Sequence, residues 1–480
     1  MPIDVSNAEV RSPAWWLKKL GQRMTTRTTG GGESRLERLN RLWSYYEGEP
    51  PLPRATKEFA DETRELMKMG RANYALLAVE ALAERMALLG GSTTADNDDD
   101  GDDVIRRLHT GSGMSAVTAD VHAYAFGMSE GYVLVGEPDA NGVPATTAED
   151  PRWCITSGDP DVPGRVRAAL KVFHDEDEGT DVAKLLLPGR VLTARRNGSG
   201  NLAHLAFGRG WDWAEDGDEG VPLPVDGGED VIPLIPFINR FGKGEYEPHL
   251  NVLNRINNTI CDRLWIAKLQ AFRQRALEDE SQDDSGELVD AEGKPVDWDD
   301  IFKADPGAMW RLPRGAKLWE STPVDLQPIL SSIKEDVREF GAVSRTPLSM
   351  LAPEASGGSA EGASLHREGL TFKANDRTKR LGPRWAEVYR TQLLFAGELD
   401  RARSAITPIW APTERYSLAQ RGSAAGQAKT SGMPWATTMR EVWQLDPEQL
   451  AQARRERAAD VLFQVAGQQP ITATGGGAGV

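Results

Sequence analysis

The stretch VIPLIPFINRFGKGE, residues 231–245, leads into the pattern that organises the chain. An apolar run ends in a Gly-rich turn. The next segment places apolar residues at steps of three and four, the spacing of one helical face: Leu253, Ile256, Ile260, Leu264, Ala267 and Ala271. A second segment follows the same rule with Leu326, Ile329, Leu330, Ile333, Val337 and Phe340. The acidic, Trp-bearing region between them has no helical period. We predict two helices that bracket a small module, which favours a stalk with a presented tip over an active-site pocket.

The region before this stretch contains both helical and strand patterns. Apolar spacing predicts helices around residues 36–46 and 74–89. Five short β-like runs follow, separated by Gly, Pro and Asp clusters, at residues 132–135, 152–156, 169–173, 183–187 and 191–193. Residues 1–32 are expected to form a flexible arm, apart from a short amphipathic piece around Trp15 and Trp16. The pattern indicates an α+β chain that is mainly helical, with a β-rich part at residues 131–238.

The region after the second helix begins with a long loop. Residues 344–360 contain Pro347, Pro353 and a Gly-Gly-Ser sequence, which is typical of a used or mobile connection. A long helix is expected over residues 361–395. Residues 396–480 are expected to form a smaller helical unit that ends in a disordered tail.

Composition bounds the functions that the chain can have. At 480 residues it exceeds one ordinary domain. The net charge of −16 argues against a wide nucleic-acid-gripping surface, because phosphate binding needs Lys and Arg. An acidic wall would still let a duplex slide past, although a charge that only maintains solubility is the commoner case. The two cysteines are expected to be buried thiols in a reducing cytoplasm, and no long apolar run predicts a membrane span.

Motifs that carry enzyme chemistry are scarce. No P-loop occurs, and the single G-x-S-x-G, at residues 127–131, follows a predicted helix and precedes a predicted strand, the reverse of a hydrolase elbow. The six histidines are scattered, so we expect neither zinc nor any other cofactor. Acidic runs at residues 96–103 and 175–178 are interpreted as solvated loops, with a metal site as the less favoured alternative.

Four segments, in this order and spacing, resemble the portal proteins of tailed bacteriophages, the ring-shaped head-to-tail connectors. RLWSYYEG at residues 41–48 resembles a helix end of that family, and NYALLAVEALAERM at residues 73–86 the helix after it. VIPLIPFINR at residues 231–240, followed by LNRINNTICDRL at residues 253–264, resembles the approach to its first stem helix. SGGSAEGAS at residues 356–364 resembles the end of its tunnel loop. The resemblance covers roughly residues 33–465, and none of the four segments is a catalytic signature.

The resemblance implies a division of the chain into the parts of a portal subunit. A wing would comprise residues 33–247 together with the long helix at residues 361–395. The stem would consist of helices at residues 248–279 and 326–343, with a small α/β clip at residues 280–325 between them. A tunnel loop would occupy residues 344–360, and a helical crown residues 396–480.

The resemblance also implies a function and a set of partners. About twelve copies would form a ring at one capsid vertex. Double-stranded DNA would enter through the ring during packaging and leave through it during ejection. The implied protein partners are the major capsid protein, a scaffold protein, the terminase large subunit and the head-completion or tail adaptors. The protein would be a virion component, assembled in the host cytoplasm, with no enzymatic activity and no membrane partner.

Candidate functional residues follow from this division. The tunnel loop offers Arg345, Leu348, Met350, Leu351 and Glu354 to DNA, and only Arg345 among them could contact a phosphate. Lys334, Glu335, Asp336 and Glu339 lie off the apolar stripe of the second stem helix, where they would face the channel or form salt bridges between subunits. The clip offers an interface to terminase or adaptor through Trp298, Trp310, Arg311 and Trp319.

Two other functions remain open at this point. The first is a metal-dependent DNA-processing enzyme that uses the carboxylates of the acidic runs. The second is a monomeric capsid adaptor, which would form no ring.

Overall fold

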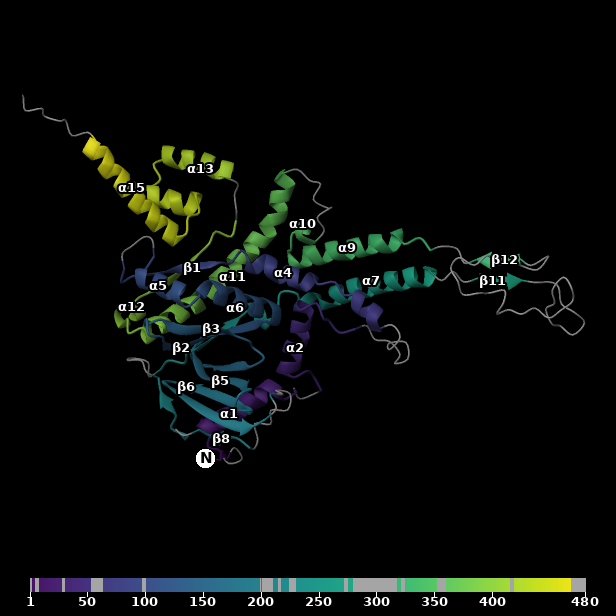
Figure 1. Cartoon of the computed structure of the whole chain (residues 1–480), viewed down its shortest axis with the longest axis horizontal. Coiled ribbons are helices and arrows are strands. Elements are labelled where there is room, and N and C mark those ends of the chain that lie inside the picture. Colours follow the sequence, from purple (N-terminus) through teal and green to yellow (C-terminus); the bar gives the residue numbers. More distant parts are fainter. Residues whose placement is uncertain are drawn as a thin grey trace, which may run out of the picture. The chain divides into compact units, whose positions relative to one another are not determined.

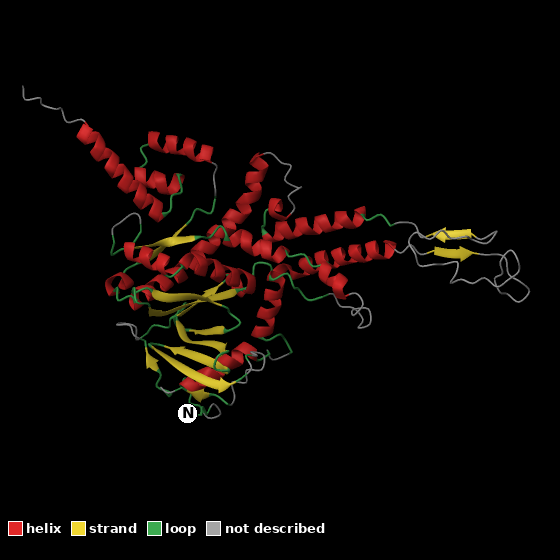
Figure 2. Cartoon of the chain, viewed as in Figure 1, coloured by secondary structure: helices red, strands yellow, loops and turns green. Residues whose placement is uncertain are grey.

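The computed structural model describes residues 2–4, 8–27, 31–52, 64–96, 101–198, 200, 210–214, 217–223, 230–271, 275–278, 317–320, 324–351, 360–414 and 418–467. Helices make up 52% and strands 20% of it, which confirms a mixed helix-and-sheet protein (Figure 2). The chain divides into two compact units. The first comprises residues 1–51, 73–253 and 339–480, and the second residues 52–72 and 254–338. Figure 1 labels many of the elements of both.

The largest sheet of the first unit is antiparallel. Its strands run in the order β4 (Cys154–Gly158), β5 (Val166–Asp175), β6 (Thr180–Leu187), β7 (Arg190–Asn197) and β8 (Asp212–Trp213), and β9 (Val221–Pro222) also pairs with β7. Side chains alternate across the sheet, so Leu170 packs into one apolar cluster and its neighbour Ala169 into another. The cluster with Leu170 also contains residues of helix α1 (Pro13–Thr25).

Helix α1 departs from the flexible arm expected at residues 1–32. Its Leu17, Leu20 and Met24 are completely buried against the sheet. Ser12 caps the helix by accepting a hydrogen bond from the Trp15 amide, and Pro13 occupies the first helical position, where its missing N–H costs nothing. The amphipathic piece around Trp15 and Trp16 is therefore part of the core.

A second, three-stranded antiparallel sheet follows in the same unit, with the order β10 (Leu234–Ile238), β2 (Glu130–Pro138) and β3 (Pro144–Glu149). Helix α6 (Met114–Met128) and the long helix α11 (Ala360–Phe395) pack on this sheet. At Ser129, whose φ is +80°, the chain turns from α6 into β2. The G-x-S-x-G motif therefore lies in a helix-to-strand turn, as the sequence predicts.

Further elements complete the first unit. Strand β1 (Leu88–Thr93) pairs with β13 (Ile406–Trp410) across a separation of some three hundred residues, so the expected crown contributes a strand to a sheet with the expected wing. The remaining helices of the unit are α2 (Arg35–Tyr46), α4 (Tyr74–Ala83), α5 (Asp103–Gly111), α12 (Leu399–Arg403), α13 (Leu418–Thr430), α14 (Trp435–Thr437) and α15 (Pro447–Gly467). Short helical turns occupy Arg240–Gly242, Glu247–His249 and Thr438–Val442.

The second unit contains most of the two predicted stem helices, α7 (Leu250–Ala271) and α9 (Gln327–Ser344). Asp325 accepts a hydrogen bond from the Gln327 amide at the start of α9, as expected of a cap. The first helix ends at Ala271, and the end at residue 279 that we predicted is wrong. Arg275–Glu278 forms strand β11, which pairs with β12 (Lys317–Glu320). No apolar residue continues the helical face of α7 past Ala271, and pairing with a distant strand prevails there.

No helix in the described part of the chain combines the length and the apolar character that crossing a bilayer requires.

Candidate functional site at the end of helix α9

The end of helix α9 is fixed by a left-handed residue. Arg345 has φ +57° and follows Ser344, the last helical residue. The Thr346 amide donates to the Gly341 carbonyl at 3.0 Å, and the Arg345 amide donates to the Ala342 carbonyl at 3.4 Å. These two bonds form a Schellman cap, whose left-handed position is usually glycine because a Cβ is strained there. An arginine in this position makes the cap less stable than glycine would, and it places a cation at the surface.

The short helix α10 (Leu348–Leu351) folds back on the end of α9. A Cβ at Gly341 would lie 2.9 Å from both the Leu348 and Leu351 side chains, so the absence of a side chain permits this close approach. Leu351 is buried and Leu348 half-buried, whereas Arg345 and Met350 are exposed. Of the predicted tunnel-loop set, Arg345 and Met350 are therefore the members exposed to a ligand, and Glu354 lies outside the described residues.

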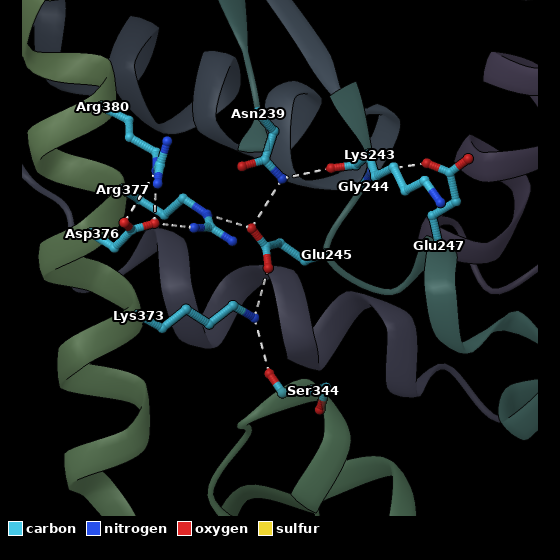
Figure 3. A network of polar contacts seen from close by, with 10 residues as sticks. All are labelled: Asn239, Lys243, Gly244, Glu245, Glu247, Ser344, Lys373, Asp376, Arg377 and Arg380. Carbon is cyan, nitrogen blue, oxygen red and sulfur yellow. Dashed lines mark hydrogen bonds and ion pairs between the residues drawn. The ribbon is translucent and has the colours of Figure 1, made fainter. Parts of the chain in front are cut away.

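A buried carboxylate links this helix end to α11 and to the turn before α7. The side chain of Glu245 is 5% exposed and accepts a hydrogen bond from Lys373 at 2.8 Å and from Arg377 at 2.7 Å. The Asn239 amide group donates to the same carboxylate at 2.9 Å. Lys373 also donates to the Ser344 carbonyl at 2.9 Å, which places a cation at the C-terminus of α9, where the helix dipole favours it. Figure 3 shows Glu245 at the centre of these contacts.

Neighbouring positive charges keep the Glu245 carboxylate ionised despite its burial. Burial alone would raise the pKa of Glu245, but the charges of Lys373 and Arg377 outweigh it and hold the pKa below its ordinary value. Burial lowers the pKa of Lys373 against the opposing pull of Glu245. The carboxylate is therefore ionised at neutral pH and pairs with two buried cations.

Local sequence explains how Glu245 reaches this position. A Cβ at Gly244 would lie 2.4 Å from the Gly127 carbonyl, so only glycine allows the turn to pass the end of α6. The Glu245 amide then donates to the Phe126 carbonyl at 2.7 Å. On α11, Asp376 forms an ion pair with Arg377 and a second one, at 2.9 Å, with Arg380. The pair with Asp376 holds Arg377 in the orientation that faces Glu245.

Above this network lies a hollow of about 270 Å³. Its walls come from the turn at residues 239–249, the end of α9 and helix α11. Five basic side chains and two carboxylates line it: Arg240, Lys243, Arg345, Lys373 and Arg377, with Glu245 and Asp376. The hollow thus carries a formal excess of three positive charges in a chain whose net charge is −16.

The predicted stem residues lie along α9. Lys334, Glu335 and Glu339 are exposed. Asp336 is 13% exposed and pairs with Arg255 of α7 at 2.9 Å, a contact within one chain. The predicted clip residues Trp298, Trp310 and Arg311 lie outside the described residues. Trp319 falls in strand β12, of whose side chains the structure gives no description.

The acidic runs have structural roles where they are described. Both oxygens of Asp102 are engaged: one accepts from the Val104 and Ile105 amides, the other from the Thr93 hydroxyl and Arg401. Asp102 is therefore the N-cap of α5, although Asp96 and Asp103 lie close enough to form an acidic cluster. Asp175 accepts from the Glu178 amide in the β5–β6 turn. Within the described part of the first run, Asp102 is therefore already engaged by donors of the protein itself.

The sequence predicted Arg345 as a candidate contact, a prediction that stays open, and it did not point to Glu245, Lys373 or Arg377. One signal was present, because Lys373 and Arg377 stand one helical turn apart and two such cations on a buried face need a counter-charge. Nothing local identified Glu245 as that counter-charge.

Comparison with known proteins gives a family match and alignments with solved structures. A family model described as "Phage portal protein, SPP1 Gp6-like" matches residues 28–461. A chain of the solved structure "Neck of native GTA particle computed with C12 symmetry" aligns with a TM-score of 0.40 and 11% identity, over 83% of this chain and 97% of that chain. A chain of "Neck of empty GTA particle computed with C6 symmetry" aligns with a TM-score of 0.37 and 13% identity, over 82% and 94% respectively. No curated protein matches the chain.

Proposed function

The chain belongs to the SPP1 Gp6-like family of phage portal proteins, and from that premise we propose that about twelve copies form a ring at one capsid vertex. DNA passes through this ring into the head during packaging and out of it during ejection. The observation that carries the proposal is the family match, which runs from residue 28 to residue 461 and so includes both compact units. The role is that of a connector and not of an enzyme.

Exposure along the stem helices supports assembly. Several apolar residues at helical spacing on α7 and α9 are only half-buried in one chain, among them Ile260, Leu264, Ile329, Leu330 and Ile333. Half-exposed apolar stripes on helices favour a neighbouring surface that covers them. In the ring, the stem helices of adjacent copies provide that surface, which explains why one chain leaves the stripes open.

The channel lining follows from the same arrangement. We assign the exposed Lys334, Glu335 and Glu339 to the bore of the stem, with Arg345 and Met350 at the loop. Asp336 forms an ion pair with Arg255, so we assign it to the contact between α7 and α9 and not to the channel lining. A predominantly acidic bore repels phosphates and lets a duplex slide, whereas Arg345 offers a local contact.

The remaining partners are assigned by segment. Residues 280–325 form the clip, which docks the terminase large subunit during packaging and the head-completion or tail adaptors afterwards. Residues 33–247 and 361–395 form the wing, which with the crown at residues 396–480 meets the major capsid protein and scaffold. Assembly takes place in the host cytoplasm and the product is a virion component.

The decisive experiment measures the mass and shape of the purified protein. Mass photometry should give particles of about twelve times the 52.5 kDa chain, and negative-stain images of the same sample should show rings with a central hole. Monomers or dimers in isolation and also after co-expression with scaffold and capsid protein would overturn the proposal and favour a monomeric adaptor.

A further inference from the structure

The basic hollow above Glu245 differs from other arginine-lined surfaces of this chain in the state of its cations. A larger hollow near β2 is lined by five arginines, but four of them pair with carboxylates: Arg35 with Glu130, Arg38 with Glu247, Arg165 with Asp230 and Arg384 with Glu387. In the hollow above Glu245, by contrast, most of the basic side chains are unpaired. Three of its five basic side chains make no ion pair or hydrogen bond with any described residue.

These three cations are Arg240, Lys243 and Arg345, and all are exposed. The guanidinium of Arg240 lies over the ring of Phe241 at 4.8 Å, a contact that orients a cation without neutralising it. The other two basic residues, Lys373 and Arg377, are already balanced by the two carboxylates, Glu245 and Asp376. The three unpaired cations are therefore at the exposed edge of the hollow, which we call its rim. The paired cations Lys373 and Arg377 form its buried floor.

The rim is built from two strained turns. Phe241 and Arg345 both have φ +57°, a left-handed conformation that non-glycine side chains rarely adopt. One lies in the turn before α7 and the other in the cap of α9, more than a hundred residues apart in sequence. Strain of this kind persists where the surrounding structure enforces it, and it is concentrated at functional sites. Here the two turns bring free cations to the lining of one hollow.

We infer that this hollow binds phosphodiester groups of the DNA backbone, through Arg240 and Lys243 of the turn before α7 and Arg345 of the α9 cap. The inference rests on the proposed function, since it takes DNA as the polyanion that passes the ring. Arginine forks and lysine ammonium groups are the donors that phosphate oxygens prefer. Because the chain as a whole is acidic, such a hollow confines contact with DNA to one place on each subunit. This extends the predicted contact beyond the tunnel loop to the turn before α7.

The test measures how salt weakens DNA binding. Fluorescence anisotropy follows a fluorescein-labelled 30-base-pair duplex bound by the full-length protein as purified, at several NaCl concentrations. The variant Arg240→Gln, Lys243→Gln, Arg345→Gln is compared with the control Arg107→Gln, Lys429→Gln, Arg455→Gln. Both variants lose three positive charges from exposed positions in the same unit, so net charge alone cannot separate them. Mass photometry records the assembly of every sample.

The expected result is a smaller salt dependence in the first variant only. The slope of log affinity against log salt should fall by about 0.9 per lost phosphate contact, hence by about 2 to 3 per hollow. The control should keep the wild-type slope. If the triple variant folds poorly, Lys243→Gln alone carries the test, with an expected change of about 0.9.

Two results would overturn the inference while leaving the ring intact in the wild type. Equal slopes in wild type and hollow variant would show that the hollow takes no phosphate. Loss of assembly in the hollow variant but not in the control would show that it is an interface between copies. If the wild type forms no ring but the slope still falls, the phosphate site stands and the proposed ring fails.

Discussion

At the scale of single residues, Glu245 is the side chain on which the site depends. Its carboxylate pairs with Lys373 and Arg377, both buried, and fixes the turn that carries Arg240 and Lys243. A buried ion pair is not by itself strong evidence of stability, because desolvation offsets much of the attraction. Removing one partner is a different matter, since the remaining charges are left buried without compensation.

The substitution Glu245→Gln should therefore destabilise the first unit by about 3 kcal/mol at neutral pH. Glu245 has a folded-state pKa below its unfolded value near 4.5, so its contribution is complete above that pH and is lost as the pH falls. The difference in the free energy of unfolding between wild type and variant should be full at pH 7 and shrink below about pH 4.5. Urea unfolding followed by tryptophan fluorescence at both pH values measures it.

A matched control comes from helix α11, which carries the partners Lys373 and Arg377. Glu387 pairs with Arg384 at a site where both side chains are a quarter or more exposed, so Glu387→Gln should cost no more than about 1 kcal/mol. Equal losses in the two variants, or a Glu245→Gln loss that does not change with pH, would show that Glu245 is not the charge that holds the site.

Two substitutions of Arg345 distinguish its effect on stability from its effect on DNA binding. Because its left-handed backbone suits glycine, Arg345→Gly should stabilise the cap of α9 by about 1 kcal/mol while it weakens duplex binding. Arg345→Ala removes the same charge but keeps the strain, so it should weaken binding equally without the gain in stability. Thermal unfolding and duplex anisotropy on the same preparations measure both quantities. A loss of stability in the glycine variant would contradict the argument, because it would mean that the Arg345 side chain stabilises the cap.

At the scale of elements, periodic segments could be predicted from the sequence and long-range pairings could not. Helices α2, α9 and α11 follow the apolar spacing, and strands β5 and β6 follow from β-like runs between turn residues. Each of these signals is contained within its own segment. Their positions are accordingly close to those expected.

The elements that were missed depend on distant partners. Strand β1 contains Gly90 and Gly91, which read as the end of a helix, yet it pairs with β13. Strand β11 lies where the first stem helix was expected to continue, and it pairs with β12. Strand formation at such places is decided by the partner strand and not by local propensity.

The candidate site shows the same limit. Arg345 could be predicted because its loop is marked by prolines and glycines. The contact of Glu245 with Lys373 and Arg377 joins segments some 130 residues apart, and its turn is a Gly-rich sequence that many chains carry. Only the packing of the turn against α6, enforced at Gly244, brings the carboxylate under α11.

At the scale of the whole molecule, charge opposes assembly and DNA binding alike. Twelve copies at −16 each would carry about −190 charges, so the subunits repel one another as they approach. Half-buried apolar stripes on the stem helices must overcome that repulsion. In the proposed phosphate site, by contrast, DNA would be held at a few cations against a general repulsion. The two events should therefore respond to salt in opposite directions.

We expect the fraction of chains in rings, at fixed protein concentration, to rise between 50 and 500 mM NaCl, because the screening length shortens from more than about 10 Å toward about 3 Å. Duplex affinity should fall over the same range, because bound counterions compete for the phosphates. The Arg107→Gln, Lys429→Gln, Arg455→Gln variant makes the net charge more negative, from −16 to −19, and should need more salt to reach half assembly. Mass photometry across the salt series measures the ring fraction. Rings that dissociate as salt increases would mean that ion pairs between subunits, and not apolar stem contacts, hold the ring together.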